Sequence, residues 1–473
     1  MTATTDRSDP LAYLDERPVP GAARDYQFPT FARSRLDNGI TLITAHLPGR
    51  PLLVAHLLLD GAGSGATGEP ADQAGATVLM ARAMTEGTAN HDAVSLIEAS
   101  ERLGAEVSAD AGWDSFAVSV DVPRSRLAPA LALLAEVALQ PSFPEDEVER
   151  LREERLNDLL QARAEPRRRV ERAFAETIYA EDAAYRRSMG GTEATVPGLT
   201  RDVLVARHAS VMRPSKATML IAGDLSGIAV EELFVRASLG DWSEPTAPAP
   251  VRGVVDSVVP GARRIVVVDR PGSPQSELRI GHLGVPRRNP DFHAISVLNA
   301  LLGGLFGSRL NALLREEKGY TYGVHSSFDM RVGSGPFAVR TAVQTEFTVP
   351  SVVETLGELQ RIREGLVTLD ELTIARDYLV GVFPLRYETS GQVAGAIAGM
   401  VAHGLADDEF DRYRPAIAAI TAEQVLAAAQ RHIRPEEASV VIVGDADAFV
   451  PALQAAGIGD VQVVREEVPE DAA

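Results

Sequence analysis

The sequence predicts an α+β protein made of two homologous repeats, and three observations lead to this fold class. A pattern of helix, Arg-Pro turn, apolar strand and Gly-Asp occurs twice at a constant spacing. A segment rich in proline and alanine lies between the two copies, and the 473-residue chain is too long for one ordinary core. We therefore predict an N-terminal arm over residues 1–33, a first repeat over 34–241, a linker over 242–260 and a second repeat over 261–473.

The repeated pattern is clearest at the end of each repeat. The first copy runs from Arg213-Pro214 through an apolar stretch to Gly223-Asp224, and the second runs from Arg434-Pro435 to Gly444-Asp445. The offset is 221 residues throughout (445 − 224), and a helical pattern precedes each Arg-Pro pair. We expect each repeat to form a mixed or antiparallel sheet with helices packed on one side.

Local patterns predict the elements of the first repeat. Asn38-Gly39 lies between two strand-like runs and predicts a hairpin, and the alternation over 106–122 predicts paired strands. We further expect a strand over 52–60, helices over 75–84 and 127–139, and one long, charged helix over 144–172.

A glycine-rich stretch, 61–66, follows the expected strand over 52–60. A dinucleotide-binding loop needs a helix that begins directly after the glycines and an acidic residue about 20 positions later. Here Thr67-Gly68-Glu69-Pro70 separates the glycines from the next helix, which argues against a nucleotide site.

The chain is acidic, with a net charge of −20 and a pI near 5.0, which argues against nucleic acid and anionic membranes as partners. The run Arg167-Arg168-Arg169 is a candidate for a local basic patch. The absence of cysteine excludes disulfides and thiolate metal ligands. Because the N-terminal residues are polar and no apolar run is long enough to span a bilayer, we expect a cytoplasmic protein.

The stretch 303–327 combines a small-residue turn, a charged helix and an aromatic strand. Leu310, Leu313 and Leu314 recur at helical spacing, and Gly319 marks the end of that helix. A strand over 320–324 is expected to follow.

This order would bring Arg315, near the helix end, close to Tyr322 on the strand. Taken alone, both residues also suit ordinary packing, because the last turn of a helix favours a basic residue and strands favour tyrosine. Ser308 and Arg309 fit either local capping of the helix or contact with a substrate. A lone histidine such as His325 more often has a structural role.

Three features together resemble the insulinase and mitochondrial-processing-peptidase family, the inverted zincins. They are the duplicated α+β unit, the opening Leu-Asp-Asn-Gly-Ile hairpin and the segment that contains Leu-Arg-Glu-Glu-Lys-Gly-Tyr-Thr-Tyr-Gly, and the resemblance extends from about residue 34 to 446. It implies a fold that forms half of a clam-shell chamber. In catalytic members of the family, His-x-x-Glu-His on a helix of the first repeat binds zinc and activates water, and a further Glu follows about 75 residues later.

The corresponding helix in this chain lacks those residues. A Gly-Thr pair after the helix sets the register and places Val78, Ala81 and Arg82 at the His, Glu and His positions. Asn157 or Asp158 takes the place of the downstream Glu, and none of the nine histidines lies in such a spacing. The resemblance therefore predicts degenerate metal positions at Val78, Ala81, Arg82 and Asp158, and no zinc in this chain.

The second repeat keeps its part of the family pattern. In the family, this repeat supplies an Arg and a Tyr, seven residues apart, that face the zinc, and Arg315 and Tyr322 match that pair. The resemblance implies that Tyr322 hydrogen-bonds the scissile carbonyl or the oxyanion and that Arg315 holds a backbone carbonyl of the substrate.

The leading hypothesis is a zinc-free subunit that completes the active site of a homologous, zinc-binding partner with His-x-x-Glu-His. The pair would cleave peptides or unfolded segments, which would bind as an added strand at a sheet edge. The alternative is a structural, scaffolding or peptide-binding protein with the same fold and no role in chemistry. For a stand-alone, metal-independent peptidase, the sequence shows no combination of nucleophile and base.

Overall fold

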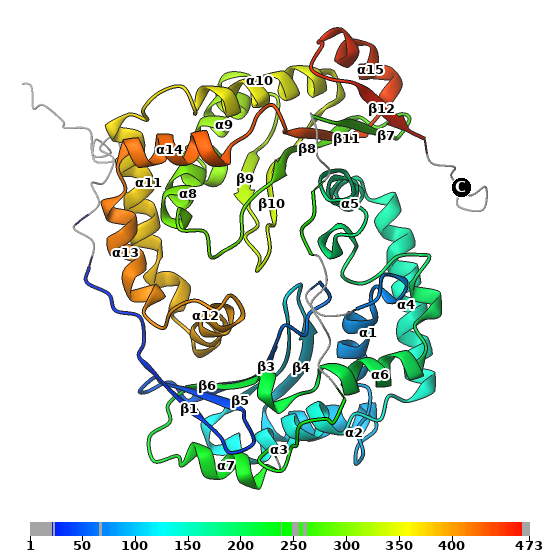
Figure 1. The fold of residues 1–473 in the computed structure, drawn as a ribbon, viewed down its shortest axis with the longest axis vertical. Coiled ribbons are helices and arrows are strands. Elements are labelled where there is room, and N and C mark those ends of the chain that lie inside the picture. Colours follow the sequence, from blue (N-terminus) through cyan, green and yellow to red (C-terminus); the bar gives the residue numbers. More distant parts are fainter. Residues whose placement is uncertain are drawn as a thin grey trace, which may run out of the picture.

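Two six-stranded mixed sheets, one in each repeat, form the framework of the protein (Figure 1). This computed structural model confirms the α+β fold class with two repeats. Most of the predicted arm, the end of the glycine-rich stretch and much of the predicted linker lie outside the described residues. The structure describes residues 21, 24–65, 69–237, 239–247, 255–258 and 263–465.

The first sheet has the strand order β1-β2-β6-β3-β5-β4. β2 and β6 are parallel, and the other neighbouring strands are antiparallel. The predicted hairpin joins β1 to β2, and Gly39 in its turn has a φ of +97°, which favours glycine. The strands are β1 Phe31–Arg35, β2 Thr41–His46, β3 Leu52–Asp60, β4 Glu106–Ala111, β5 Ser115–Pro123 and β6 Ala217–Gly223.

The second sheet has the equivalent order, β12-β7-β11-β8-β10-β9. Its outermost strand has a different origin, because β12 comes from the C-terminal part of the chain and is parallel to β7, whereas β1 precedes β2 and is antiparallel to it. The repeated Gly-Asp pattern thus ends two equivalent central strands, β6 and β11. The strands are β7 Ile265–Asp269, β8 Gln275–Leu283, β9 Val324–Phe328, β10 Pro336–Gln344, β11 Ser439–Gly444 and β12 Val461–Val464.

Helices of the same repeat pack on one face of each sheet, as predicted. The helices of the first repeat are α1 Ala76–Ala83, α2 Ala93–Leu103, α3 Leu127–Leu139, α4 Glu145–Ala164, α5 Pro166–Ile178, α6 Arg201–Val211 and α7 Val230–Arg236, and all but α5 belong to this arrangement. The helices of the second repeat are α8 Phe292–Asn299, α9 Arg309–Asn311, α10 Thr348–Arg361, α11 Leu369–Val382, α12 Ser390–Ala402, α13 Glu409–Ala419, α14 Ala422–His432 and α15 Ala446–Ala455, and all but α12 belong to it. Two further segments, Ala300–Gly304 and Ala312–Glu317, are π-helical.

Each repeat also places one helix on the sheet of the other repeat, which the sequence did not predict. Helix α5 of the first repeat packs on the second sheet, where Phe174 lies in one cluster with Val441 and Val443 of β11. Helix α12 of the second repeat packs on the first sheet, where Ile397 lies in one cluster with Leu220 of β6. Figure 1 shows α5 and α12 on opposite sides of the centre of the molecule. The two repeats are therefore interlocked by exchanged helices.

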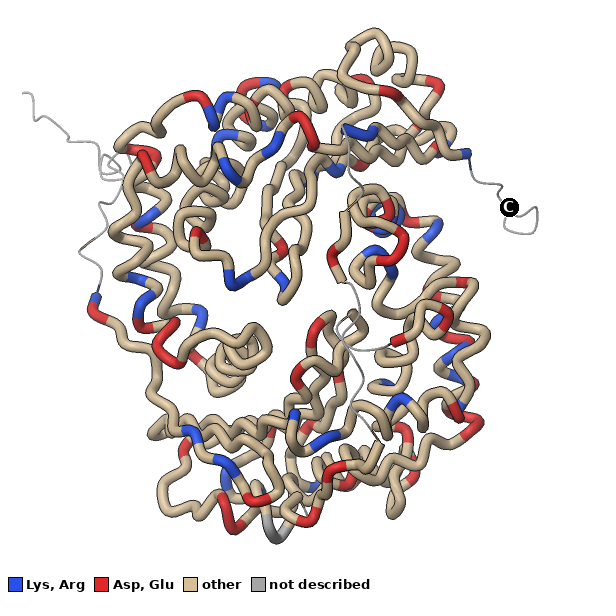
Figure 2. Tube along the Cα trace, viewed as in Figure 1, with Lys and Arg blue, Asp and Glu red and all other residues tan. Residues whose placement is uncertain are grey.

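This exchange explains why the central strands are apolar on both faces. In β11, Val440 and Ile442 belong to the core of their own repeat, and Val441 and Val443 pack against α5. Strands buried on both faces read as continuous apolar runs. Every residue of β6 and β11 is buried and uncharged, and Figure 2 shows the charged residues mainly on the surrounding helices and loops.

The predicted helix over 144–172 is wrong as one element, because the chain breaks at Pro166. Pro166 is at the first position of α5, and Glu165 before it is extended, with φ −92° and ψ 113°. Proline disfavours the helical conformation of the preceding residue, which separates α4 from α5. This break turns α5 away from its own repeat and toward the second sheet.

The described part of the predicted N-terminal arm packs against the second repeat. Phe28 is buried and stacks on Phe410, with ring centroids 4.5 Å apart, and it meets the edge of the Tyr387 ring at 5.1 Å. Strand β1 begins at Phe31, slightly before the predicted start of the first repeat. The arm therefore anchors the first repeat to helices of the second.

One helical stretch, Phe292–Glu317, has the length and the mean hydropathy, 1.3, of a membrane-spanning helix. Leu298, Leu302, Leu310 and Leu314 of this stretch are fully buried in the core of the second repeat. Its apolar composition is accounted for by that core.

Candidate functional site

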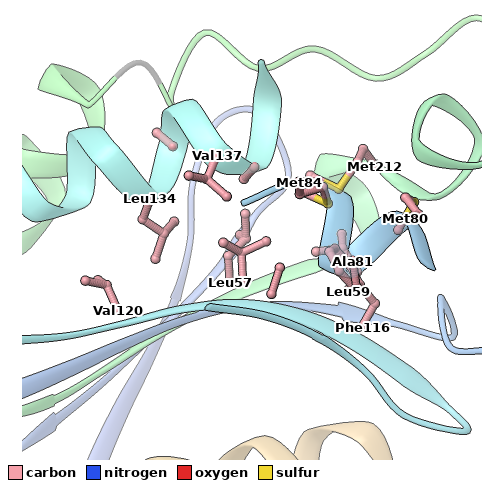
Figure 3. Close-up of a cluster of buried hydrophobic side chains, with 14 of the residues drawn as sticks. Leu57, Leu59, Met80, Ala81, Met84, Phe116, Val120, Leu134, Val137 and Met212 are labelled. Atoms are coloured by element: carbon pink, nitrogen blue, oxygen red, sulfur yellow. The ribbon is translucent and has the colours of Figure 1, made fainter. Parts of the chain in front are cut away.

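The three positions predicted to correspond to His-x-x-Glu-His lie on α1. Ala81 is 1% exposed and packs in the core of the first repeat, and Figure 3 shows it beside Leu59 and Phe116. Val78 is partly exposed and lines a cavity. Arg82 forms an ion pair with Glu154 of α4, with 2.9 Å between Nη2 and Oε2. These contacts place Ala81 in the packing of the first repeat and tie Arg82 to α4.

Asp158, at the downstream position on α4, is held by two arginines. Arg168 of α5 donates two hydrogen bonds to its carboxylate, at 2.8 and 3.0 Å, and Arg155 forms a further ion pair with it. The hydrogen bonds from Arg168 hold the pKa of the Asp158 carboxyl below its ordinary value.

These residues do not fit a zinc ion. Zinc needs imidazole, thiolate or carboxylate ligands, and Val78 and Ala81 offer none, while Arg82 brings a positive charge. The one carboxylate, Asp158, is already paired with cations. Within the described ranges, no group of three or more His, Cys, Asp or Glu side chains is placed to hold a metal.

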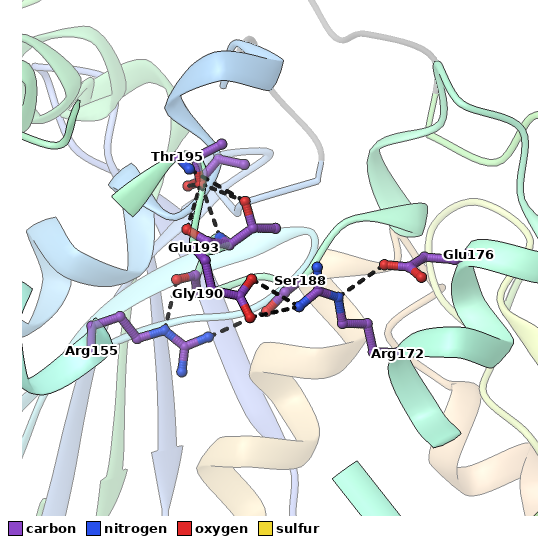
Figure 4. Close-up of polar contacts among 9 residues, drawn as sticks. Arg155, Arg172, Glu176, Ser188, Gly190, Glu193 and Thr195 are labelled. Carbon is purple, nitrogen blue, oxygen red and sulfur yellow. Dashed lines mark hydrogen bonds and ion pairs between the residues drawn. The ribbon is translucent and has the colours of Figure 1, made fainter. Parts of the chain in front are cut away.

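Arginines instead surround this degenerate site, and the polar contacts of two of them are drawn in Figure 4. Arg155 donates to the Gly190 carbonyl at 2.8 Å and to the Ser188 hydroxyl at 3.3 Å. Arg172 of α5 pairs with Glu176 at 2.9 Å and with Glu193 at 3.0 Å. These bonds fix the loop of residues 187–195 against α4 and α5. The arginine run in the sequence indicated a basic patch here, but the contribution of this loop carried no sequence signal.

Arg315 and Tyr322 lie on either side of the predicted helix end. Arg315 belongs to the π-helical segment Ala312–Glu317, and Gly319 ends the helix with a φ of +66°. The predicted strand over 320–324 is wrong, because β9 begins only at Val324. Tyr322 therefore lies in the connection that precedes β9, and its side chain is 95% exposed.

The guanidinium of Arg315 lies over the ring of Phe306, 4.2 Å from its centroid, and 3.5 Å from a carboxylate oxygen of Glu316. Phe306 is itself 72% exposed. Among the described residues, none of the hydrogen bonds, ion pairs or ring contacts joins Arg315 to Tyr322. The two side chains share a short segment of chain without touching.

The connection that carries Tyr322 is fixed at both ends. Tyr320 stacks on Phe347 with ring centroids 4.7 Å apart, and the Thr321 hydroxyl donates to the Ala342 carbonyl at 2.8 Å. Asn311, which is 6% exposed, donates to the Val324 carbonyl at 2.8 Å and accepts from its amide at 3.1 Å. Sequence reasoning missed Asn311, whose signal is a polar residue within the apolar helical pattern. The backbone at Tyr322 is thus held in place while its side chain is exposed.

Ser308 and Arg309 make contacts within the fold. Ser308 precedes α9, but its hydroxyl makes no capping bond to the helix and instead accepts from the Asn311 amide at 3.2 Å. Arg309 pairs with Glu371 of α11 through two hydrogen bonds, at 2.6 and 3.1 Å. His325 is exposed on β9, opposite Arg340 of β10. A substrate role for Ser308 or Arg309 stays a prediction.

Two copies of one α+β unit, with zinc ligands missing at the predicted metal positions, point to the class of duplicated metallopeptidase folds. Comparison with protein families gives the same class. The model "Insulinase (Peptidase family M16)" matches residues 61–192, and the model "Peptidase M16 inactive domain" matches residues 198–379. The chain belongs to the insulinase family, peptidase family M16.

Relatives extend over most of the chain. A Mycobacterium bovis protein named an uncharacterized zinc protease is 27% identical over 365 residues, which cover 76% of this chain and 80% of that protein. A Helicobacter pylori protein named a non-peptidase homolog is 23% identical over 347 residues, which cover 72% of this chain and 76% of that protein. A crystal structure of a peptidase M16 inactive domain from Pseudomonas fluorescens shows the same fold, with a TM-score of 0.79 and 24% sequence identity. The match covers 88% of this chain and 98% of the Pseudomonas chain.

Proposed function

We propose that this chain is the zinc-free subunit of a two-chain metallopeptidase. A homologous partner with His-x-x-Glu-His would supply zinc and the activating carboxylate, and this chain would supply Arg315 and Tyr322. The two subunits would enclose a peptide or unfolded segment between them. The chain would hydrolyse no peptide by itself.

The observation that carries this proposal is the contrast between the two repeats. At the predicted metal positions of the first repeat, Ala81 contributes to packing, Val78 to a cavity wall and Arg82 to an ion pair. The second repeat holds Tyr322 at 95% exposure on a backbone that is fixed by Tyr320 and Asn311. A fixed backbone under an exposed hydroxyl suits a group that acts on another molecule.

The proposed chemistry is donation of hydrogen bonds. The Tyr322 hydroxyl would donate to the scissile carbonyl and to the oxyanion formed from it, and the Arg315 guanidinium would donate to a backbone carbonyl of the substrate. The stacking on Phe306 limits the positions that Arg315 can take. A preorganised donor of this kind contributes about 2.7–4 kcal/mol to transition-state stabilisation, so its loss would lower turnover by about a hundredfold or more.

The substrate would bind as an extended strand. β9 forms one edge of the second sheet and directly follows Tyr322. A peptide added at such an edge is recognised mainly through its main-chain groups. This mode would make cleavage tolerant of sequence.

The test is reconstitution with the homologous subunit whose sequence contains His-x-x-Glu-His. The wild-type chain, Arg315→Gln and Tyr322→Phe are each assayed alone and with the partner for bound zinc, complex formation and hydrolysis of a fluorogenic peptide. Tyr378→Phe is the matched control, because Tyr378 of α11 is 48% exposed and lies outside the proposed site. Tyr322→Phe should keep the complex and lose turnover, and Tyr378→Phe should keep both. Zinc-dependent hydrolysis by the lone wild-type chain would overturn the proposal.

A structural or scaffolding function is the second candidate, and the name of the Helicobacter pylori relative, a non-peptidase homolog, favours it. The same assay separates the two. Unchanged turnover of the complex with Tyr322→Phe would favour a scaffold over a half-site.

A further inference from the structure

A cavity of about 580 Å³ lies beside the degenerate metal position. Its walls come from both repeats, because α4, α5 and Val78 face Arg331 and Arg340 of the second repeat across it. Its size is within the usual range of about 300–1,000 Å³ for ligand sites. The cavity is separate from the segment of Arg315 and Tyr322, none of whose residues lines it.

The charge of this cavity is opposite to that of the chain. Nine arginines and only two acidic residues, Glu171 and Asp329, are among its described lining residues. The whole chain carries a net charge of −20. Solvent ions screen distant charges over about 10 Å at ordinary ionic strength, so a small anion in the cavity would interact mainly with nearby groups. There the nine arginines outnumber the carboxylates, even when Asp158, Glu176 and Glu193, which pair with lining arginines, are counted with Glu171 and Asp329.

Several of these arginines are fixed by the fold. Arg155 and Arg168 are held by Asp158. Arg331 donates from Nε and Nη2 to the Asp329 carboxylate, at 3.0 and 2.6 Å, and lies over the rings of Trp113 and Tyr185 at 4.5 and 4.7 Å. Fixed guanidinium groups lose little freedom when an anion binds, which favours binding.

Arg187 and Arg331 of the cavity wall each have a buried nitrogen without an acceptor among the described residues. The Nη1 atoms of Arg187 and Arg331 are buried and make no hydrogen bond to the residues that the structure describes. For Arg187, no hydrogen bond or ion pair of the guanidinium to a described residue occurs. A buried charged donor without an acceptor is unfavourable, and an anionic ligand would supply one when the side chain turns toward the cavity.

We infer that this cavity binds an acidic peptide segment, whose carboxylates pair with Arg187 and Arg331. The lining also includes Leu159, Phe174 and Met189, which suit apolar side chains between the acidic ones. A long polyanion such as nucleic acid would extend beyond the cavity onto the negatively charged remainder of the chain. The chemistry of the cavity therefore matches short clusters of Asp or Glu in a polypeptide.

Binding of acidic segments would add a substrate preference to the proposed function. The evidence for this binding comes only from the cavity and does not depend on the peptidase activity. Where the partner subunit brings zinc, the same cavity would hold part of the substrate. Binding by the lone chain is expected in either case, so failure of the peptidase proposal would not affect the test described next.

The test measures fluorescence anisotropy of two labelled peptides with the full-length chain. One peptide carries a run of glutamates, and the other carries glutamines at the same positions. We expect the glutamate peptide to bind at least about tenfold more tightly, because each charge-assisted hydrogen bond contributes at least that factor. Its affinity should fall as salt is raised.

Variants locate the binding. Arg187→Gln should weaken binding of the glutamate peptide about tenfold or more, and Val78→Glu should weaken it similarly by placing a carboxylate in the cavity. Arg102→Gln is the matched control, because the Arg102 side chain is 70% exposed on α2 and lies outside the cavity. Thermal unfolding of each variant verifies that it is folded.

Three results would overturn the inference. The first is equal affinity for the glutamate and glutamine peptides at low salt. The second is equal weakening by Arg187→Gln and Arg102→Gln, which would indicate a diffuse charge effect. The third is found if inorganic phosphate displaces the labelled glutamate peptide at as low a concentration as unlabelled glutamate peptide does. The cavity would then be a general oxyanion site.

Discussion

His282 is expected to make the stability of the fold depend on pH. Its ring is 3% exposed at the end of β8, where Nδ1 donates to the Leu283 carbonyl at 2.9 Å and Nε2 accepts from the Arg434 amide at 3.0 Å. These two bonds require the neutral ring with its proton on Nδ1. Burial, together with the charge of Arg434, lowers the pKa of His282 to about 3.

The sign of the effect follows from proton binding. Between an unfolded-state pKa of about 6.5 and the folded-state value of about 3, the unfolded chain binds a proton at this residue and the folded chain does not. The free energy of unfolding therefore falls as pH is lowered through this window, by up to about 1.4 kcal/mol per pH unit, or about 2.7 kcal/mol from pH 7.5 to pH 4.5.

The assay is urea unfolding at constant ionic strength from about pH 7.5 to about pH 4.5, with His282→Gln beside the wild type. The variant should be less stable at neutral pH, by about 1–3 kcal/mol for the lost hydrogen bond, but its stability should fall less steeply below pH 6.5. His46→Gln is the control, because the His46 side chain is 47% exposed. Equal slopes for His282→Gln and the wild type would refute the reasoning.

Two further predictions concern the contacts between the repeats. Phe174→Ala should lower the free energy of unfolding by about 3–5 kcal/mol, because the Phe174 ring is 2% exposed where α5 packs on the second sheet. The control is Leu160→Ala on α4, which should have a small effect because Leu160 is 56% exposed. Similar urea midpoints for the two variants would contradict the exchanged-helix packing. Glu171→Gln should lower the free energy of unfolding by about 1–3 kcal/mol, because Glu171 pairs with the buried Arg279 at 2.8 Å and with Arg340 at 3.2 Å. The same variant should bind the glutamate peptide more tightly, because it removes a negative charge from the cavity. Weaker peptide binding by a folded Glu171→Gln protein would contradict the assignment of the cavity.

The repeat and most elements could be predicted because their signals are local. Strand β3 and helix α3 have the predicted bounds, since a continuous apolar run and a helical apolar pattern both end at charged or turn residues. The exchange of α5 and α12 could not be predicted in this way. The break at Pro166 was visible in the sequence, but the side to which the chain turns depends on tertiary packing.

The candidate site shows the same division. The predicted degenerate metal positions rest on residue identity alone, which the sequence gives directly. The cavity could not, because its arginines come from α4, α5, the loop of residues 187–195 and the second repeat, and only Arg167-Arg168-Arg169 stand together in the sequence. Tyr322 illustrates a third case: its residue type suits a strand, but the Asn311 side chain binds the first backbone groups of β9 and keeps the preceding residues outside the sheet.

The packing of α1 explains how a metal site can be absent while the fold is kept. Glu69, which is 8% exposed, accepts hydrogen bonds from the Gly75 amide at 2.9 Å and the Thr77 amide at 2.8 Å, so a buried carboxylate satisfies donors at the start of the helix. Arg207 of α6 donates to the Thr77 hydroxyl at 2.9 Å and ties the same helix turn to α6. Because these bonds and the burial of Ala81 hold α1 in place, none of its anchoring contacts requires a metal ligand. A chain with this arrangement can keep the fold of the family without zinc ligands on α1.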